Sequence, residues 1–373
     1  MKKFLNAIIV LIAFHSNSLI SQEVEETVVV TSALIDTSQI TNPLYVIDGL
    51  DIADDATTSL GDAIDSYLGV SIADYGAAVG QPIIRGMSGP RVKILKNGMV
   101  NRDVSGLGVD HLNDVDLNDI SQLEIVKGPS SLLYANGTIG GIINVVDECI
   151  SAINYELPEL KVGYETQSVN DGDSKNINYK SNIGGFNINF GHNKIDFGNY
   201  DVPFGAVLHD EDHDEHDEHD EHDGHEEDEH HEEDMGFINN SDYAVEATKF
   251  GISKVGDWGY VGISVDNLES VYGIPFHGDE HGDEHGDDHE DHEDEEEHEE
   301  HGDERIFSTT DSESTTIKGS YNVNGNIVNN IDFTFRNSDY TLTEAHEEEE
   351  GHDDHGDEEE EHAPTVFANE AIE

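Results

Sequence analysis

The sequence is poor in cysteine, in basic residues and in long apolar runs, and each shortage excludes a class of protein. Cys149 is the single cysteine among 373 residues, so no disulfide can form within the chain. Only 17 lysines and arginines stand against 83 acidic residues, and the formal charge of −66 opposes binding to nucleic acid. After residue 21 there is no run of about 20 apolar residues, which excludes a helical transmembrane domain.

The first 21 residues have the pattern of an export signal. Lys2 and Lys3 precede an apolar run from Phe4 to Phe14, and small or polar residues follow. We therefore expect residues 1–21 to be a signal peptide. An exported chain without apolar helices that spans a membrane must do so as a β-barrel.

Histidine is concentrated in three acidic tracts, which hold 19 of the 22 histidines. Residues 209–234 contain 8 histidines and 17 acids, residues 277–304 contain 7 and 17, and residues 344–362 contain 4 and 12. Without these tracts the net charge falls to −20, from 37 acids and 17 bases. Imidazole and carboxylate groups bind borderline divalent cations such as Zn²⁺, so each tract is a candidate metal-binding segment.

Five histidines of the first tract recur at every third residue, which would place them on one face of an extended chain. Such a segment repels itself and has nothing apolar to bury, so we expect disordered loops with many weak, exchangeable metal sites. Alternatively, the repeats are low-complexity expansions that only keep the loops soluble. The candidate metal-binding residues of the tracts are His209, His213, His216, His219, His222, His225, His277, His281 and His285.

Residues 44–150 have the composition of one compact α+β domain. Leu60, Ala63, Ile64 and Leu68 would share one helix face, which predicts a helix over residues 59–68. A second, short helix is expected over 130–134. Strands are expected over residues 45–47, 70–72, 82–85, 92–95, 120–127 and 142–146.

From about residue 161 onward, short segments alternate polar and apolar residues and are joined by short turns or by the acidic tracts. This pattern is typical of an outer-membrane β-barrel, with a soluble β-sandwich as the alternative. Because barrels of this kind close and the chain ends in what resembles a further strand, we expect a truncated sequence. The seven segments are 162–164, 177–179, 186–190, 243–253, 258–266, 315–321 and 331–335.

Three motifs resemble those of the TonB-dependent outer-membrane receptors. They are Ile84-Arg85-Gly86, Val126-Lys127-Gly128-Pro129, and residues 134–145, in the order and spacing of that family's plug domain. Lys127 stands where the family usually has arginine. The resemblance implies an α+β plug domain, residues 44–150, inside an antiparallel transmembrane β-barrel, of which residues 151–373 are the N-terminal part.

The resemblance also implies partners. Residues 22–43 would contain a TonB box that pairs with the periplasmic protein TonB by strand addition. Energy would come through TonB, so no nucleotide site and no prosthetic group are expected. We expect a Gram-negative outer-membrane protein in contact with lipid and a divalent metal, and no enzyme. The TonB-box residues are Glu26, Thr27, Val28, Val29, Val30 and Thr31.

Within this family the chain is most similar to the zinc-uptake receptors of the ZnuD type. The tracts, the segment 272–277 and the segment 105–111 carry this similarity. Asp110 and His111 place a carboxylate and an imidazole side by side on an expected apical plug loop, although such a pair is also found in ordinary solvated turns. His192 lies in a strand-like segment and is expected to be structural.

The expected function is import of a divalent metal, with zinc first among the candidates. The tracts would capture it and pass it to Asp110 and His111. Nickel, copper, cobalt, haem or a metal chelate are alternative cargoes, because metal affinities overlap. Another alternative is a surface protein that binds or buffers metal without transport.

Overall fold

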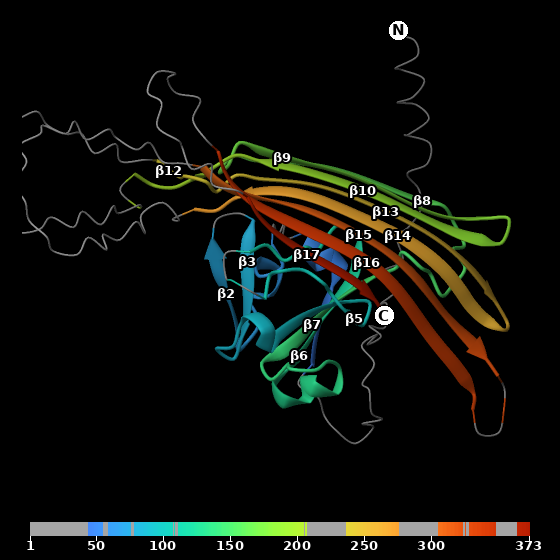
Figure 1. The fold of residues 1–373 in the computed structure, drawn as a ribbon. Helices are drawn as coiled ribbons and strands as arrows, with labels where there is room; N and C mark the ends of the chain where they lie inside the picture. Colours follow the sequence, from blue (N-terminus) through green and yellow to red (C-terminus); the bar gives the residue numbers. More distant parts are fainter. Residues whose placement is uncertain are drawn as a thin grey trace, which may run out of the picture.

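The computed structural model describes residues 44–54, 59–75, 78–106, 108, 111–204, 206, 236–275, 305–323, 325, 328–347 and 364–373. Within these ranges the chain forms an N-terminal domain and a large antiparallel sheet that arches over it (Figure 1). No helix in these ranges combines the length and the apolar character needed to cross a membrane.

A five-stranded sheet in the order β1-β6-β7-β4-β5 forms the centre of the N-terminal domain. Strands β4 and β7 pair in parallel, the other pairs are antiparallel, and β2 and β3 form a separate hairpin. The elements are β1 (Leu44–Asp48), α2 (Gly49–Asp54), η1 (Asp62–Ile64), β2 (Val70–Tyr75), β3 (Val79–Ile84), η2 (Gly89–Arg91), β4 (Val92–Lys96), β5 (Met99–Val100), β6 (Ile120–Lys127), η3 (Gly128–Leu133) and β7 (Gly141–Asp147).

All the strands predicted for this domain are present, but the helix predicted over residues 59–68 is wrong. Only the 3₁₀ turn η1 forms there, because the backbone bonds after Gly61 span three residues, as in Ile64 N–H to Gly61 O. Leu68, expected on the buried face, is 83% exposed. Gly69 then takes a positive φ of 78° and turns the chain into β2.

Two of the sequence motifs meet in the fold. Gly128 has a φ of 77°, and a Cβ atom at this position would lie 2.5 Å from Nη1 of Arg85. The close approach therefore requires glycine. The neighbouring Lys127 donates a hydrogen bond to the carbonyl oxygen of Leu68, and its Nζ lies 4.1 Å from the ring centroid of Tyr45.

Eight antiparallel strands make up the large sheet, in the order β17-β16-β15-β14-β13-β10-β9-β8. Each of the seven predicted segments lies in one of these strands, and β17 is the eighth. The short strands β11 (Tyr200–Asp201) and β12 (Phe237–Ile238) form a separate pair. The sheet strands are β8 (Glu159–Gln167), β9 (Gly172–Ile183), β10 (Phe186–Phe197), β13 (Tyr243–Gly256), β14 (Gly259–Gly273), β15 (Arg305–Asn322), β16 (Asn330–Glu347) and β17 (Thr365–Ile372).

The three histidine-rich tracts are all connected to the same end of this sheet. Phe197 at the end of β10 pairs with Tyr243 at the start of β13. In the same way, Gly273 of β14 pairs with Phe307 of β15, and β16 meets the start of β17. The chain segments between these strands contain the tracts. Residues 344–347 of the third tract belong to the end of β16, and the rest of the tracts lies outside the described residues. We call this end of the sheet the tract end.

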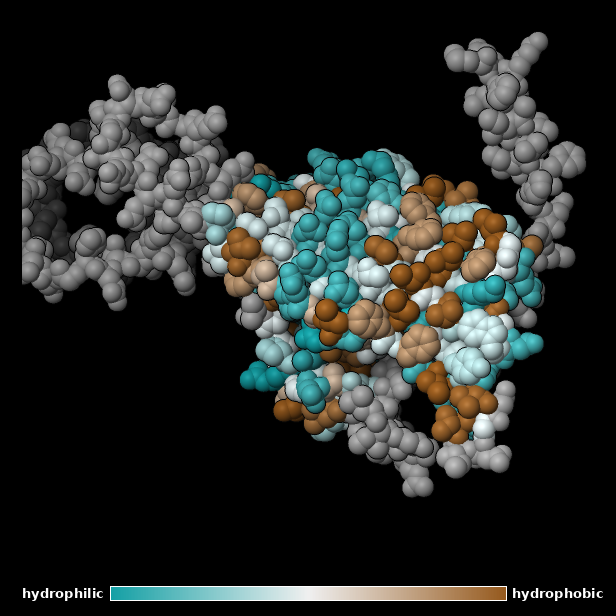
Figure 2. Space-filling model, turned by 45° about the vertical axis from the view of Figure 1, so that its right-hand side comes forward, coloured by the Kyte–Doolittle hydropathy of each residue, from teal (hydrophilic) through white to brown (hydrophobic). Residues whose placement is uncertain are grey.

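The outer face of the sheet divides into an apolar part and a charged part. Apolar side chains such as Phe250, Ile263 and Phe335 are exposed towards the short turns at the other end. Nearer the tract end, four charged residues occupy consecutive paired positions across four strands: Lys194, Glu246, Glu269 and Asp311. Figure 2 shows the apolar surface and the hydrophilic strip beside it. The apolar part suits contact with lipid hydrocarbon.

Candidate substrate site between the N-terminal domain and the sheet

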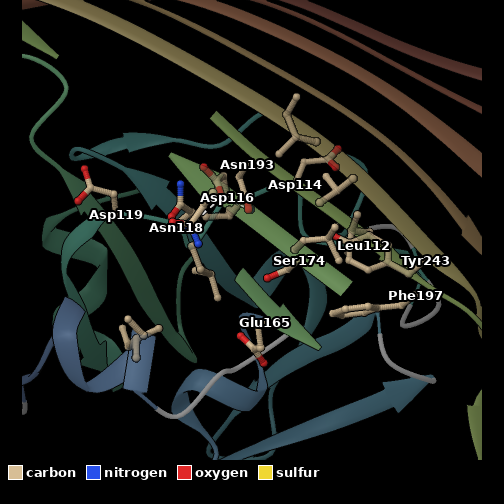
Figure 3. A pocket seen from close by; sticks show the side chains of 18 of the residues that line it. Leu112, Asp114, Asp116, Asn118, Asp119, Glu165, Ser174, Asn193, Phe197 and Tyr243 are labelled. Atoms are coloured by element: carbon tan, nitrogen blue, oxygen red, sulfur yellow. Dashed lines mark hydrogen bonds between the residues drawn. The ribbon is translucent and has the colours of Figure 1, made fainter. Parts of the chain in front are cut away.

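The segment from His111 to Asp119 has no regular secondary structure and runs along the inner face of the sheet. Val115 and Leu117 pack against the core of the N-terminal domain. The alternate residues point the other way, towards the strands (Figure 3): Asp114 accepts a hydrogen bond from Thr310, Asp116 from Asn193, and Asn118 exchanges amide hydrogen bonds with Asn178.

Successive contacts of this segment lie two strand residues further from the tract end each time. Tyr272 of β14 contacts Leu112, and the next inward position, Ser270, pairs with the Thr310 that contacts Asp114. Further from the tract end, Ala247 of β13 pairs with both Leu268 of β14 and Asn193 of β10, the partner of Asp116. Each step covers about 7 Å along a strand.

His111 is buried at the end of this segment that lies nearest the tract end. The side chain is 7% exposed, and its ring centroid lies 6.3 Å from that of Phe367 in an edge-on arrangement. The backbone carbonyl accepts a hydrogen bond of 2.6 Å from Nε2 of Gln81, which fixes the loop. Nδ1 of His111 has no hydrogen-bond partner among the described residues, so it is free to act as a ligand atom.

Residues that flank all three tracts surround this position. The backbone N–H of Leu112 donates to the hydroxyl of Tyr272, 3.4 Å away, just before the second tract. Leu112 also packs in one cluster with Phe197 and Tyr243, which flank the first tract. Phe367 follows the third tract in β17. The N-terminal domain therefore presents a buried imidazole beside described residues that flank all three tracts.

Asp114 is a buried carboxyl group. Its Oδ1 accepts a hydrogen bond of 3.2 Å from Thr310, and the buried hydroxyl of Tyr340 also hydrogen-bonds to this carboxyl group. Burial, and then the nearby Asp103 carboxylate, raise the pKa of Asp114 to about 8. Asp103 is held by Ser105 and Asn101, which donate bonds of 2.6 and 2.9 Å.

A cavity of about 160 Å³ separates this segment from the sheet. Figure 3 shows Asp114, Asp116, Asn193 and Glu165 around it. A smaller cavity of about 60 Å³ shares Asp114 and Asp116 with the first. The larger cavity has acidic and no basic lining residues, whereas Lys96, Arg102, Lys249 and Arg336 also line the smaller one.

Ion pairs also connect the N-terminal domain to the sheet. Lys96 lies 2.8 Å from Asp266 of β14 and 3.7 Å from Asp147 of β7. On the other side, Lys180 of β9 lies 3.1 Å from Asp119. Burial raises the pKa of Asp147, but Lys96 and then Lys249 outweigh it and lower the value to about 2. These buried pairs fix the position of the domain against the strands.

The structure describes only part of the predicted site. Asp110 and the candidate histidines of the tracts lie outside the described residues, so their metal-binding role stays a prediction. The TonB-box residues 26–31 also lie outside them, and their pairing with TonB stays a prediction. Within the described ranges, no three His, Cys, Asp or Glu side chains are arranged to hold a metal ion. His192 lies on β10, with Nδ1 3.0 Å from the hydroxyl of Thr248.

Asp114 was missed by the sequence reasoning, although a signal for it exists. Asp114, Asp116 and Asn118 alternate with Val115 and Leu117, which is the pattern of an extended segment with one polar face. The pattern does not reveal which strands that face contacts. Thr310, for example, is 196 residues away in the sequence.

Comparisons with known proteins agree with this geometry. Residues 36–142 match the sequence profile of the TonB-dependent Receptor Plug Domain family. A hemin receptor of Yersinia enterocolitica is 29% identical over 152 residues, which cover 39% of this chain and 21% of that protein. The vitamin B12 transporter BtuB of Vibrio vulnificus is 26% identical over 154 residues, covering 39% and 25%. The chain thus spans about a quarter or less of these relatives.

Solved structures share the fold over most of the chain. The copper transporter OprC superposes with a TM-score of 0.56 at 13% identity, covering 81% of this chain and 37% of that one. The FrpB iron transporter of Neisseria meningitidis gives 0.54 at 11% identity, covering 80% and 41%.

The N-terminal domain is therefore a TonB-dependent receptor plug domain, and the strands after it have the fold of part of such a receptor's barrel. Proteins of this class are receptors of the Gram-negative outer membrane and not enzymes, and this places the chain in that membrane.

Proposed function

We propose that this chain belongs to a TonB-dependent receptor that imports a divalent metal ion, with zinc as the cargo. The observation that carries the proposal is that His111 and its neighbour Leu112 together contact residues that flank all three histidine-rich tracts. The tracts capture metal at low concentration and raise its level above the plug. Asp110 and His111 then receive it, and TonB, pulling on residues 26–31, opens the path.

The donor chemistry supports zinc over a hard cation. Imidazole and carboxylate ligands together suit Zn²⁺, whereas calcium and magnesium are bound by oxygen atoms. Nδ1 of His111 lacks a partner in the described structure, and burial protects it from bulk water. The choice of zinc rests on His111 and on the histidines and acids of the tracts.

A second candidate cargo is haem or copper. The relatives include a hemin receptor, and the fold is shared with a copper transporter. These similarities concern the plug domain and the fold. The argument for zinc is instead drawn from the histidine-rich tracts of this chain. Haem would compete with zinc for uptake only if the two cargoes share a site.

The test is uptake of ⁶⁵Zn by cells that carry the full receptor, with and without the proton gradient. We expect gradient-dependent accumulation that unlabelled zinc competes away and hemin leaves unchanged. If the cells accumulate the same amount of ⁶⁵Zn after the gradient is collapsed, the protein binds metal at the surface without transporting it. Competition by hemin or copper, without competition by zinc, would transfer the proposal to that cargo.

A further inference from the structure

The chain segment that leads to His111 is held at both of its ends by one side chain of β3. Gln81 is only 4% exposed, and its Nε2 donates hydrogen bonds to the carbonyl oxygen of Ser105, 3.0 Å away, and to that of His111, 2.6 Å away. A side-chain amide nitrogen carries two hydrogens, so each of them serves one end of residues 105–111. The reversed amide would place its oxygen against two carbonyl oxygens, so the contacts fix its orientation.

Asp103 connects the same part of the chain with the opposite polarity. Its Oδ1 accepts hydrogen bonds from the hydroxyl of Ser105 at 2.6 Å and from the Ser105 backbone N–H at 3.3 Å. Its Oδ2 accepts from Nδ2 of Asn101 at 2.9 Å and from the backbone N–H of Asp114 at 3.3 Å. One donor side chain and one acceptor side chain therefore join the chain on either side of residues 106–110. We call Gln81 and Asp103 the loop clamp.

The strand that carries Gln81 is itself fixed on two sides. The neighbouring Gly80 accepts a hydrogen bond of 3.3 Å from Nδ2 of Asn113, which lies two residues beyond His111. A Cβ atom at position 80 would lie 2.1 Å from Oγ of Ser59, so the chain packs here at a distance that only glycine allows. The donors of Gln81 are therefore presented from a rigid element, which precise positioning of a binding group requires.

The bond from Gln81 acts on the backbone of His111 and leaves its ring nitrogens available. The ring lies edge-on to Phe367 with 6.3 Å between the centroids, and its Nδ1 has no hydrogen-bond partner among the described residues. The position of the imidazole therefore follows from the position of the backbone that Gln81 holds. Groups that orient a metal ligand in this way affect metal affinity although they do not touch the ion.

We propose that Gln81 and Asp103 are positioning residues, which hold the two ends of residues 105–111 together and thereby set where the His111 imidazole meets an incoming metal ion. The inference rests on the proposed function for the identity of the ion, whereas the loop clamp is a property of the plug domain without metal. When the clamp is lost, the imidazole is still present but its backbone can move. Affinity for metal then falls, while a saturating metal concentration still fills the site.

The first test separates affinity from maximal rate. Gln81→Met keeps the length of the side chain and removes both donors. We expect the half-saturating zinc concentration for ⁶⁵Zn uptake to rise on the order of tenfold, with the maximal rate per folded receptor unchanged. The amount of folded receptor in the outer membrane is measured by heat-modifiable gel mobility.

The matched control is Gln122→Met, because Gln122 is another buried glutamine of the plug domain and its Nε2 donates to Glu124 instead, at 2.9 Å. This variant should keep the half-saturating concentration of the unmodified receptor. An unchanged half-saturating concentration in Gln81→Met would overturn the inference. An equal rise in both variants would overturn it as well, because any weakening of the plug would then have the same effect.

The second test needs no metal. In the detergent-solubilised full receptor, hydrogen exchange of the Leu112 and Asp114 amides should be on the order of tenfold faster in Gln81→Met than in the unmodified protein, with the β7 amides unchanged. Unchanged exchange would overturn the loop clamp and leave the proposed function intact. Absence of zinc uptake by the unmodified receptor, together with faster exchange in Gln81→Met, would overturn the proposed function and support the clamp.

Discussion

Asp147 and Lys96 form a buried ion pair at the edge of the plug domain, next to Asp266 of the barrel strands. The pKa of the Asp147 carboxyl is lowered from 3.8 to about 2 in the folded protein. A depressed carboxyl pKa stabilises the fold above the unfolded value of about 3.9, and that contribution is lost as the pH falls towards 2.

We therefore expect Asp147→Asn to destabilise the plug at pH 7 by roughly 2–3 kcal/mol, and to have little effect near pH 2. Hydrogen exchange of the β7 amides in the detergent-solubilised receptor measures this difference. Asp51→Asn, which changes an exposed residue of α2, is the control. An equal effect of Asp147→Asn at both pH values would rule out the ion pair as its cause.

His111 and His192 allow a matched comparison of two histidines. His111 is buried with a free ring nitrogen, whereas the ring of His192 contacts a hydroxyl on β10's neighbour, β13. We expect His111→Ala to weaken zinc uptake at limiting metal on the order of tenfold or more, and His192→Ala to leave it unchanged. ⁶⁵Zn uptake at graded zinc concentrations measures both. Equal uptake by the two variants would contradict the ligand role of His111.

At the scale of elements, sequence patterns located the strands but not their pairing. Two-residue alternation marked seven of the eight sheet strands, because inward polar and outward apolar residues alternate along each of them. The helix expected over 59–68 did not form, because the backbone hydrogen bonds after Gly61 span three residues and give only the 3₁₀ turn η1. The sequence could not predict that residues 111–119 run along the inner face of the sheet. Their hydrogen-bond partners lie in β9, β10, β14 and β15, which are distant in the sequence.

All three tracts are connected to the same end of the sheet, which predicts that they act together. Removing residues 209–234 alone should lower uptake only at limiting zinc, because the other two tracts still concentrate the ion. Removing all three should raise the half-saturating zinc concentration and spare the maximal rate. Replacing one tract by a glycine–serine segment of equal length is the control for loop length. A fall in the maximal rate would assign the tracts a part in translocation.

At the scale of the whole molecule, capture and transport depend on different parts of the chain. The tracts are connected to the end of the sheet at which His111 lies, and the predicted TonB box at residues 26–31 precedes the plug domain in sequence. If TonB acts through this segment, its deletion removes the energy source and leaves the capture surface in place.

We therefore expect deletion of residues 26–31 to abolish gradient-dependent zinc uptake while surface-bound ⁶⁵Zn stays at the wild-type level. Both are measured on the same cells, by washing one half of the sample with a chelator that removes only external metal. Val29→Pro is the sharper variant, because proline removes the backbone donor that strand addition needs and alters one residue only. Deleting residues 32–35, which lie between the predicted box and the residues that match the plug family, controls for linker length. If uptake survives both changes to the predicted box, the energy must enter elsewhere, and the role assigned to residues 26–31 is wrong.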